Sequence, residues 1–529
     1  MQNTDSVLIE AKHLTLQFPG ESVPLFSGVN MFLTTGQQAL VGRNGIGKSC
    51  LAAILAGKMM PSEGYVHRFC DVGYLSQKEA QLPGTGADVL GINIIRQVNE
   101  RILIGKGTPD DFNFMEGQWN WESETKVFLE EGGLSSDVLD RAFVSLSGGE
   151  QTRLRLLALK KQGYDFIVLD EPSNHLDRNG RIWLAQWLSA FNGGSLLVTH
   201  DTYLLEKVSS IYELNSIGIE HSQGGWQSWL ESREQLRLGI QRETELSKKY
   251  LQQVQRDKQK MREKAEKRQN QGKSRRSNAN QSKIILDREQ GRSEATQSRN
   301  AKLYDERIQR AAVNAMQAKD KLEIIEPLVI VASMPERATN PLLYLRNVVL
   351  PFGTLTPVNL VLNSGERLAI LGDNGSGKST LLKVMAGLIK PVTGECTVTR
   401  SHRLMDQHFS FLDKELSALQ NFQHQAPGWT ENLYRTRLAQ LRIHSDIVLK
   451  PVSTLSGGEQ LKIALACLFC GPSAPSLLIL DEPDNHLDIE SRELLQQALR
   501  NYKGAILLVS HDIKFIEKIG DMNYLCLNL

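Results

Sequence analysis

The sequence predicts an α/β protein made of two tandem domains, each with its own parallel sheet, joined by a long antiparallel α-helical hairpin. A duplication predicts the tandem domains, because the run from Gly42 to Ser49 is restated from Gly372 to Ser379, 330 residues later. The hairpin is predicted from residues 231–326, which lie between the copies and are proline-free and highly charged. The expected boundaries are therefore residues 1–230, 231–326 and 327–529.

The composition is that of a globular protein with an uneven charge distribution. Of 529 residues, 41% are hydrophobic, enough for several buried cores, and the formal net charge is +1. Residues 241–320 hold 21 basic and 11 acidic residues, which leaves 40 basic and 49 acidic ones elsewhere. No apolar run approaches the roughly 20 residues that cross a bilayer, and Met1 to Glu10 has no signal-peptide pattern. We therefore expect a cytoplasmic protein without a membrane partner.

The six cysteines are predicted to be buried thiols, because most of them fall within apolar patterns. Cys467 and Cys470 have the C-x-x-C spacing of some metal and redox sites. They lie in or next to the apolar run from Ile463 to Phe469, however, and the sequence has no second such pair. This usage is consistent with a reducing compartment.

The run from Gly42 to Ser49 has the pattern G-x-x-x-x-G-K-S, which is typical of a P-loop. It follows an apolar strand, Gln38 to Val41, and precedes a predicted helix, Cys50 to Gly57. The glycines would let backbone N–H groups surround phosphates, while Lys48 would supply a positive charge and Ser49 a hydroxyl ligand for Mg²⁺. The pattern therefore predicts a site for ATP and Mg²⁺.

A second strand predicts the rest of the chemistry. The buried run from Phe166 to Leu169 ends in Asp170 and Glu171, and strand ends of a parallel sheet face the ligand. Asp170 would hold Mg²⁺, and Glu171 would polarise the water that attacks the γ-phosphate. A surface acid pair at a strand end is the alternative interpretation of these two residues alone.

The run from Leu146 to Gln151, LSGGEQ, matches the signature motif of ATP-binding-cassette (ABC) ATPases. Other segments then fall in that family's order: Gln77 resembles its Q-loop glutamine, Ser173 to Asp177 its D-loop, and His200 its switch histidine. The resemblance implies that Gln77 contacts Mg²⁺ and that His200 acts beside Glu171 during hydrolysis.

The second half repeats the whole set. The resemblance implies catalytic roles for Glu171, His200, Glu482 and His511, and metal ligation by Ser49, Gln77, Asp170, Ser379, Gln407 and Asp481. It assigns the nucleotide to Phe18, Gly42, Asn44, Gly45, Gly47, Lys48, Ser49, Gln77, Ser147, Gly148, Gly149, Phe352, Gly372, Asn374, Gly375, Gly377, Lys378, Ser379, Thr380, Gln407, Ser456, Gly457 and Gly458. Phe18 and Phe352 stand where the family has an aromatic residue that stacks on adenine, although a phenylalanine at a strand end is more often a core residue.

The resemblance also implies that two cassettes pair head to tail, so that each ATP lies between one P-loop and the other half's signature. The first site would combine Lys48 and its partners with Ser456 and Gly458. The second would combine Lys378 and its partners with Ser147 and Gly149. ATP would then hold the cassettes together, and hydrolysis would release them.

The spacing of the motifs locates an insertion in the first domain. Lys48 and Lys378 are 330 residues apart, but Ser147 and Ser456 are 309 apart. About twenty extra residues therefore lie before the first signature, and we place them near residues 92–124. Trp119 and Trp121 in this stretch would form either a contact surface or the core of a helical subdomain.

The linker is predicted to pair two helices through narrow apolar stripes, with its turn at Gly272 in the polar run from Arg268 to Ser282. A helix over 231–268 would be about 57 Å long at about 1.5 Å per residue. The expected stripes are Leu236, Ile240, Leu246, Tyr250, Val254 and Met261, and then Leu303, Ile308, Ala312, Met316 and Leu322.

Two complete cassettes joined by such a linker resemble the ABC-F family of translation factors. The resemblance implies a monomer that binds the ribosome when closed on ATP and places its linker near the P-site tRNA and the peptidyl-transferase centre of the large subunit. It implies relief of stalling or displacement of antibiotics, and it makes the insertion at 92–124 a short form of the family's arm.

The charge of the linker independently favours an RNA partner, because basic side chains near its tip would contact phosphates. The candidate RNA-binding residues are Lys264, Lys267, Arg268, Lys273, Arg275 and Arg276. A solvated coiled-coil face is the alternative interpretation of this charge.

Two other functional classes stay open. An ATPase subunit of a membrane transporter would co-purify with a membrane protein, but it has no evident use for a basic hairpin of this length. A DNA-structure-binding ABC ATPase would prefer branched DNA to ribosomes. In that class, however, the coiled coil splits one cassette, whereas here it separates two complete ones.

Overall fold

The computed structural model divides into two compact units, Met1–Gln227 with Leu328–Leu529, and Ser228–Pro327. The boundaries of the second unit lie within three residues of the predicted linker, 231–326. The structure describes residues 7–21, 23–77, 84–174, 176–215, 218–276, 299, 302–318, 328, 330, 332–336, 341–372, 375–443, 445–485 and 487–527.

The first domain is built on a six-stranded sheet of order β5-β6-β7-β3-β8-β9. Its strands are β3 (Gly36–Gly42), β5 (Val72–Leu75), β6 (Phe166–Asp170), β7 (Gly194–Val198), β8 (Ser210–Asn215) and β9 (Gly218–Gln223). All neighbouring pairs are parallel except β8 with β9. Every residue of β6 and β7 is buried, as expected of central strands covered on both faces.

A smaller antiparallel sheet, order β2-β1-β4, completes the part of this domain that contains the P-loop. It consists of β1 (Val7–Leu16), β2 (Phe26–Thr34) and β4 (Glu63–Arg68). Apolar residues of β1, β2 and the helix α1 (Lys48–Leu55) share one core cluster with Phe166, Val168, Leu196 and Val198 of the large sheet. The helix that follows the P-loop is thus fixed between the two sheets.

Helices make up the rest of the first domain. They are α2 (Gly86–Val89), α3 (Asn93–Leu103), α4 (Pro109–Met115), α5 (Trp121–Glu131), η1 (Ser136–Leu139), η2 (Phe143–Ser145), α6 (Gly148–Gln162), α7 (Arg178–Ser189) and α8 (Thr202–Leu205). Ala87, Leu129, Val138, Phe143 and Leu154 belong to a separate core cluster that supports the start of α6.

The second domain repeats this plan with sheets of order β14-β15-β16-β12-β17 and β11-β10-β13. Its strands are β10 (Leu343–Val349), β11 (Val358–Leu362), β12 (Arg367–Gly372), β13 (Thr393–Val398), β14 (His402–Met405), β15 (Leu477–Asp481), β16 (Ala505–Val509) and β17 (Asn523–Leu527). Its helices are α11 (Lys378–Met385), α12 (Ala418–Gln425), α13 (Glu431–Gln440), α14 (Ser445–Val448), η3 (Val452–Thr454), α15 (Gly457–Phe469), α16 (Ile489–Asn501) and α17 (Ile513–Ile519).

Matching β-bridges locate the extra residues of the first domain. Thr85 pairs with Ala142 in the first domain, and Ser417 pairs with Pro451 at the corresponding place in the second. These pairs span 57 and 34 residues. The additional length contains α3 and α4, which overlap the predicted insertion at 92–124. Trp119 is 53% exposed there, whereas Trp121 packs against the subdomain core.

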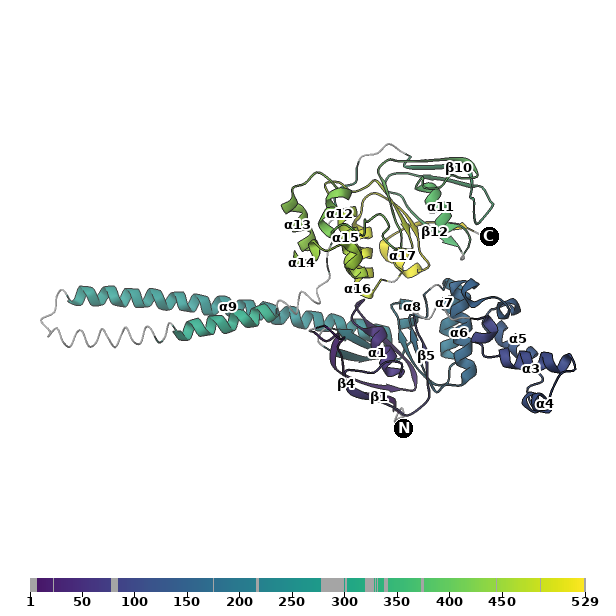
Figure 1. Cartoon of the computed structure of the whole chain (residues 1–529). Helices are drawn as coiled ribbons and strands as arrows, with labels where there is room; N and C mark the ends of the chain where they lie inside the picture. Colours follow the sequence, from purple (N-terminus) through teal and green to yellow (C-terminus); the bar gives the residue numbers. More distant parts are fainter. Residues whose placement is uncertain are drawn as a thin grey trace. The chain divides into compact units, whose positions relative to one another are not determined.

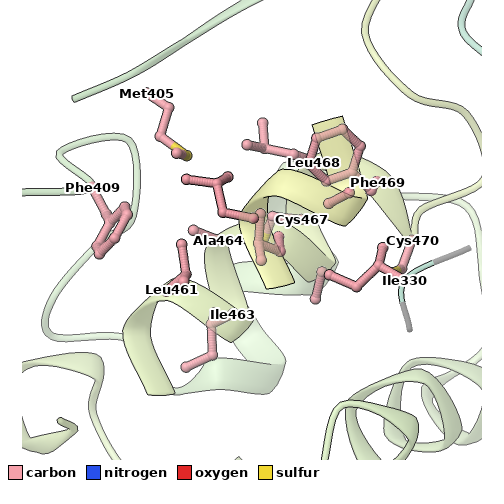
Figure 2. Packing of buried hydrophobic residues seen from close by; sticks show 14 of the residues in the cluster. Ile330, Met405, Phe409, Leu461, Ile463, Ala464, Cys467, Leu468, Phe469 and Cys470 are labelled. Atoms are coloured by element: carbon pink, nitrogen blue, oxygen red, sulfur yellow. The ribbon is translucent and has the colours of Figure 1, made fainter. Parts of the chain in front are cut away.

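The core of the second domain is centred on α15 (Figure 2). Leu461, Ile463 and Leu468 are fully or almost fully buried, and Ile330, from the segment after the linker, belongs to the same cluster. Cys467 and Cys470 pack here as free thiols, and burial raises the pKa of Cys470 to about 11. The expectation of buried thiols was too broad, because Cys526 is exposed and Cys50, Cys70 and Cys396 are only half-buried.

The linker unit contains α9 (Gly225–Arg276), a helix of 52 residues, and a second helical segment at 302–318 that lies beside it (Figure 1). The prediction of a turn at Gly272 was wrong, because α9 continues for four residues beyond that glycine. A single glycine in a solvated helix costs only about 1 kcal/mol, and the surrounding Gln, Lys and Arg residues favour helix. Residues 277–298 lie outside the described part of the chain.

The predicted apolar stripes of the linker were only partly right. Leu246, Tyr250 and Met316 are 66%, 57% and 67% exposed. Val254, a residue of the predicted stripe, is buried, but other buried positions are small or polar: Thr244, Ala311, Ala315 and Ala318. The Thr244 hydroxyl donates to Ala318 O at 3.0 Å, and Lys258 pairs with Asp305. Small side chains let the helices approach closely, so the larger apolar residues point outward. Leu322 lies outside the described residues.

In the part of the chain that the structure describes, no helix combines the length and apolar character needed to span a bilayer.

Candidate active sites

Strand order brings the predicted catalytic segments together at one edge of each large sheet. β6, β7 and β3 are neighbours, so the ends of these parallel strands place Asp170, His200 and the P-loop side by side. β15, β16 and β12 do the same for the second domain. Residues that are more than 100 positions apart in sequence thus share each site.

Glycines shape both P-loops. Gly47 caps α1 with φ 102° and Gly377 caps α11 with φ 94°, a left-handed conformation that favours glycine. A Cβ on Gly42 would lie 2.4 Å from Leu214 O, so a larger residue would displace the loop from the neighbouring strand. Gly45 and Gly375 also have positive φ, 83° and 84°.

The P-loop lysines fold back over their own loops. Lys48 Nζ donates to Gly42 O at 2.8 Å and to Arg43 O at 3.0 Å, and Lys378 Nζ donates to Gly372 O at 2.8 Å. Burial lowers the pKa of Lys48, against the raising effect of Glu171, Asp488 and Asp170. The lysine Nζ would therefore already lie next to an anion that bound in the loop. Thr380 is half-buried in the first turn of α11, and Asn374 lies outside the described residues.

A serine and an aspartate meet at each predicted metal position. Ser379 Oγ donates to Asp481 Oδ1 at 3.2 Å, and a Ser49 hydrogen bond lowers the pKa of Asp170 against the larger raising effect of burial. Among the described residues, no group forms a hydrogen bond with the buried Asp170 Oδ1. No cluster of three His, Cys, Asp or Glu metal ligands exists among the described residues. One carboxylate and one hydroxyl fit Mg²⁺, which takes few protein ligands beside phosphate oxygens.

The two candidate catalytic glutamates share an uncommon backbone conformation. Glu171 has φ 50° and Glu482 has φ 47°, in the left-handed region. Each donates its N–H to the adjacent strand, to Val198 O at 2.8 Å and to Val509 O at 2.9 Å. Each also accepts at its carbonyl from the asparagine three residues on, at 3.2 Å. This tight turn directs the carboxylate away from the strand, and such strain is common at functional sites.

In the second domain, Glu482 is held by several partners. Gln407 Nε2 donates to its Oε2 at 2.7 Å, Asn485 Nδ2 donates to the same oxygen, and His511 Nε2 lies 3.2 Å from Oε1. Burial raises the pKa of Glu482, but His511, Lys378 and Asn485 together lower it below its ordinary value. The carboxylate is therefore stabilised as an anion.

In the first domain, the corresponding carboxylate has fewer such partners. His200 Nε2 lies 3.7 Å from Glu171 Oε1. Among the described residues, neither ring nitrogen of His200 has a hydrogen-bond partner, and His511 Nε2 of the second domain also has none. Burial is the largest cause of a raised pKa at Glu171 and of a lowered pKa at His200. Gln77 is exposed after β5, and residues 78–83, which follow it, lie outside the described part of the chain. The same motif thus has two different environments.

The signature motifs form the N-termini of helices. Ser147 caps α6 and Ser456 caps α15, each in a capping box with the glutamate three residues on. Glu150 Oε2 accepts from Ser147 N at 2.7 Å, and Glu459 Oε2 accepts from Ser456 N at 2.9 Å. Gly148 and Gly149 therefore open α6, and Gly457 and Gly458 open α15, with first-turn amides that suit an anion.

The two predicted adenine-stacking residues lie on the surface. Phe18 follows β1 and is 38% exposed, and Phe352 follows β10 and is 74% exposed. These values exclude a core role, which was the alternative interpretation of both residues.

The D-loop of the second domain contacts the P-loop of the first. Asp488 Oδ2 accepts from Asn44 N at 2.8 Å, and Arg43 Nε pairs with Glu490 Oε2 at 2.7 Å. The charge of Arg43 also affects the pKa of Lys462, which is on the signature helix α15. Glu206 and Lys514, which follow the two switch histidines, form an ion pair. These contacts bring the first P-loop near the second signature helix.

Several of these contacts could not be predicted from the motifs. Asn485 and Asp488 lie within the D-loop of the second domain, Asp484 to Asp488, but the motifs assigned no individual role to either of them or to Arg43. The signal was available, since residues from Glu171 to Asp201 and from Glu482 to Asp512 correspond at a constant offset of 311. Between the glutamate and the last aspartate of the D-loop, residues 171–177 and 482–488, the halves differ only at Ser173 and its counterpart Asp484.

Both domains match the same protein family. The family model described as ABC transporter matches residues 26–174 and 355–485. The putative ATP-binding protein YdiF of Bacillus subtilis is 30% identical over 91% of this chain and 74% of its own length. ATP-binding cassette sub-family F member 3 of Mus musculus is 26% identical over 95% of this chain and 69% of its own length.

A solved structure shares the fold. The complex of an archaeal ribosomal stalk protein with the archaeal ribosome recycling factor aABCE1 matches with a TM-score of 0.58 and 18% identity, over 96% of this chain and 86% of that one. The match extends through both P-loop domains of the chain described above.

Proposed function

This chain belongs to the ABC transporter family of ATP-binding cassette proteins, and we propose that it is an ABC-F-type ATPase that acts on the ribosome. It would bind the ribosome with ATP in both sites, place its basic hairpin near the P-site tRNA and the peptidyl-transferase centre, and leave after hydrolysis. The observation that carries the proposal is a long basic hairpin between two complete ATPase domains.

Hydrolysis is assigned to the side chains that gather at the sheet edges. Glu171 and Glu482 are the proposed general bases. Each lies in a strained turn at the end of a strand, β6 or β15, and one strand, β7 or β16, separates that strand from the one that leads into the P-loop. His200 and His511 lie within 3.7 Å and 3.2 Å of these carboxylates and would orient the base and the γ-phosphate. Lys48 and Lys378 would neutralise phosphate charge.

Magnesium has a suitable pair of ligands in each site. Ser49 with Asp170 and Ser379 with Asp481 would hold it, with Gln77 and Gln407 as further oxygen ligands. When bound, the ion neutralises charge on the phosphate oxygens. The Gln407 amide donates through Nε2 to Glu482, which leaves its oxygen available for this role.

Closure would make each ATP a bridge between domains. Ser456 and Gly458 would complete the first site, and Ser147 and Gly149 the second. The contacts of Asn44 with Asp488 and of Arg43 with Glu490 support this pairing at the first site. Because hydrolysis removes the γ-phosphate, the signature amides would lose their ligand and the domains would separate.

The hairpin supplies the proposed contact with RNA. Lys264 and Lys267 are exposed near the far end of the described helix. Arg268, Lys273, Arg275 and Arg276 continue α9, and their side chains lie outside the description. Basic side chains on a helix this long suit a phosphate-lined channel, where affinity falls as salt rises. Relief of stalling or displacement of an antibiotic is the proposed outcome.

Ribosome pelleting tests the proposal. The variant Glu171→Gln, Glu482→Gln should close on ATP without hydrolysing it, and we expect ATP-dependent pelleting with 70S particles that weakens as salt rises. The matched control, Lys48→Ala, Lys378→Ala, should not pellet because it cannot hold ATP. Absence of ATP-dependent pelleting, with ATPase activity intact in the unmodified protein, would contradict the proposal. Preferential binding to branched DNA or co-purification with a membrane protein would then support the other classes.

A further inference from the structure

The two D-loops differ at one chemically important position. The offset of 311 that aligns Glu171 with Glu482 and His200 with His511 also aligns Ser173 with Asp484. The second domain therefore has a carboxylate two residues after its candidate general base, where the first has a neutral hydroxyl. The family motif does not explain this difference.

Asp484 connects the two strand ends that hold the catalytic pair. Its Oδ2 accepts from Ser510 Oγ at 3.1 Å, and Ser510 is the residue directly before His511. Ser510 Oγ in turn accepts from Asp512 N at 3.1 Å. The bond thus joins the turn after β15, which carries Glu482, to the end of β16, which carries His511.

The first domain has only part of this arrangement. Thr199 Oγ1 accepts from Asp201 N at 3.1 Å, as Ser510 does from Asp512. Ser173 stands in place of the carboxylate that extends the chain of bonds in the second domain. The distance between histidine and glutamate is 3.7 Å here, against 3.2 Å in the second domain.

The surroundings of Asp484 act on its carboxyl group in opposite directions. Burial is the largest effect and raises the pKa of Asp484, and Asp512 raises it as well, whereas Arg492, the hydrogen bond from Ser510 and Arg181 of the first domain lower it. Arg492 is itself buried and paired with Asp512. Within the described part of the chain, Asp484 Oδ1 is buried without a hydrogen-bond partner, so Oδ2, which accepts from Ser510, makes the contact with the end of β16.

We propose that Asp484 is a positioning residue that aligns His511 with Glu482 through Ser510, and that it makes the second site the faster of the two in ATP hydrolysis. At the first site, His200 and Glu171 have a serine, Ser173, at the equivalent position. These two side chains would become aligned only when ATP binds and the second domain closes on it. The two sites therefore contribute unequally, and Asp484 determines part of the difference.

Single-site variants measure this directly. Glu171→Gln leaves hydrolysis to the second site, and Glu482→Gln leaves it to the first. We expect Asp484→Ser to lower kcat about tenfold in the Glu171→Gln protein, with KM for ATP unchanged, because the hydrogen bond between residue 484 and Ser510 is lost. In the Glu482→Gln protein the change should stay below about twofold.

Two further variants separate positioning from folding. Asp484→Asn keeps an acceptor for Ser510 and should restore most of the lost kcat. Ser510→Ala removes the same bond from the other side and should reproduce the effect of Asp484→Ser, which keeps the proposal testable if Asp484→Ser does not fold. Ser173→Asp should raise kcat of the first site about threefold.

An equal loss of kcat in both backgrounds would overturn the proposal, because it would indicate general damage. Unchanged kcat in the Glu171→Gln background would overturn it as well. Since ATPase activity alone is measured, the outcome is independent of ribosome binding.

Discussion

The first and second ATPase domains have the same fold and the same motifs, yet their candidate catalytic glutamates lie in different surroundings. Glu482 accepts from Gln407 and Asn485 and lies close to His511. Burial is the largest cause of the raised pKa of Glu171, and the histidine of this site lies further from the carboxylate. A motif therefore specifies which side chains meet, while neighbours outside it, such as Asp484, determine how well they are aligned.

The largest expected effect concerns the two glutamates themselves. Removing a general base lowers hydrolysis at its own site by about 10²-fold or more. If the second site carries most of the turnover, Glu482→Gln should leave much less total ATPase activity than Glu171→Gln. Steady-state phosphate release from the two variants measures this. Equal residual activities would show that the different surroundings of the two carboxylates have no catalytic consequence.

The next expected effect is on thermal stability and concerns two ion pairs, one in each domain, at equivalent positions. Arg492 and Asp512 form a buried pair, and breaking such a pair costs about 3–5 kcal/mol. Arg181 and Asp201 are 3.4 Å apart, so this bond is longer. We therefore expect Arg492→Ala to lower the thermal unfolding midpoint more than Arg181→Ala does. Arg346→Ala, at an exposed position on β10, is the surface control. A larger loss for Arg181→Ala would reverse the comparison.

The same pair gives the second domain a pH dependence. Burial raises the pKa of Asp512, but Arg492 and the hydrogen bond from Phe515 N lower it by a larger amount. The pKa of Asp512 in the folded protein is therefore below its ordinary value. A lowered pKa stabilises the fold above the unfolded-state value of about 3.9, and this stabilisation is lost as pH falls through the folded pKa.

Thermal unfolding between pH 6 and pH 3, followed with Asp512→Asn as the control, measures this contribution. The unmodified protein should lose stability toward low pH more steeply than the variant. Parallel curves for the two proteins would exclude Asp512 as the source.

The smallest expected effect is a loss of stability that should be equal in the two domains. Both signature helices begin with a capping box of the same geometry, in which a serine and a glutamate satisfy two N–H groups. Glu150→Ala and Glu459→Ala should each cost about 1 kcal/mol, seen as similar small decreases in unfolding midpoint. A clear difference between them would mean that the asymmetry extends beyond the catalytic turns.

Much of the fold could be predicted from sequence because the P-loop, the acidic strand end and the signature each depend on local backbone geometry. Glycine at positive φ and the S-x-x-E capping box are properties of short segments. The candidate sites followed because parallel strand ends meet at one edge. The different surroundings of Glu171 and Glu482 could not be predicted, since they depend on side chains that meet only after folding, such as Asp484 with Ser510.

In the hairpin, the helices could be predicted from the sequence but most of their buried residues could not. High charge and the lack of proline predicted the helices, whereas hydrophobicity did not identify most of the side chains that are buried. Leu246 and Tyr250 are exposed while Ala315 and Thr244 are buried. In a two-helix pair, close approach of the backbones can favour small residues over large ones, and Thr244 satisfies its hydroxyl by donating to Ile240 O and Ala318 O. The identity of the apolar residues alone does not reveal this choice.

The most direct test of the proposed function is footprinting of ribosomal RNA and P-site tRNA by the ATP-trapped Glu171→Gln, Glu482→Gln protein. We compare it with the same protein carrying Lys264→Glu, Lys267→Glu, and with a matched charge reversal near the hairpin base, Lys248→Glu, Lys249→Glu; all four lysines are exposed. We expect protection near the peptidyl-transferase centre that only the distal reversal weakens. In that variant, the magnitude of the slope of log affinity against log salt concentration should fall by about one to two units. Protection that is equally strong in all three proteins, or absent from that region, would contradict it.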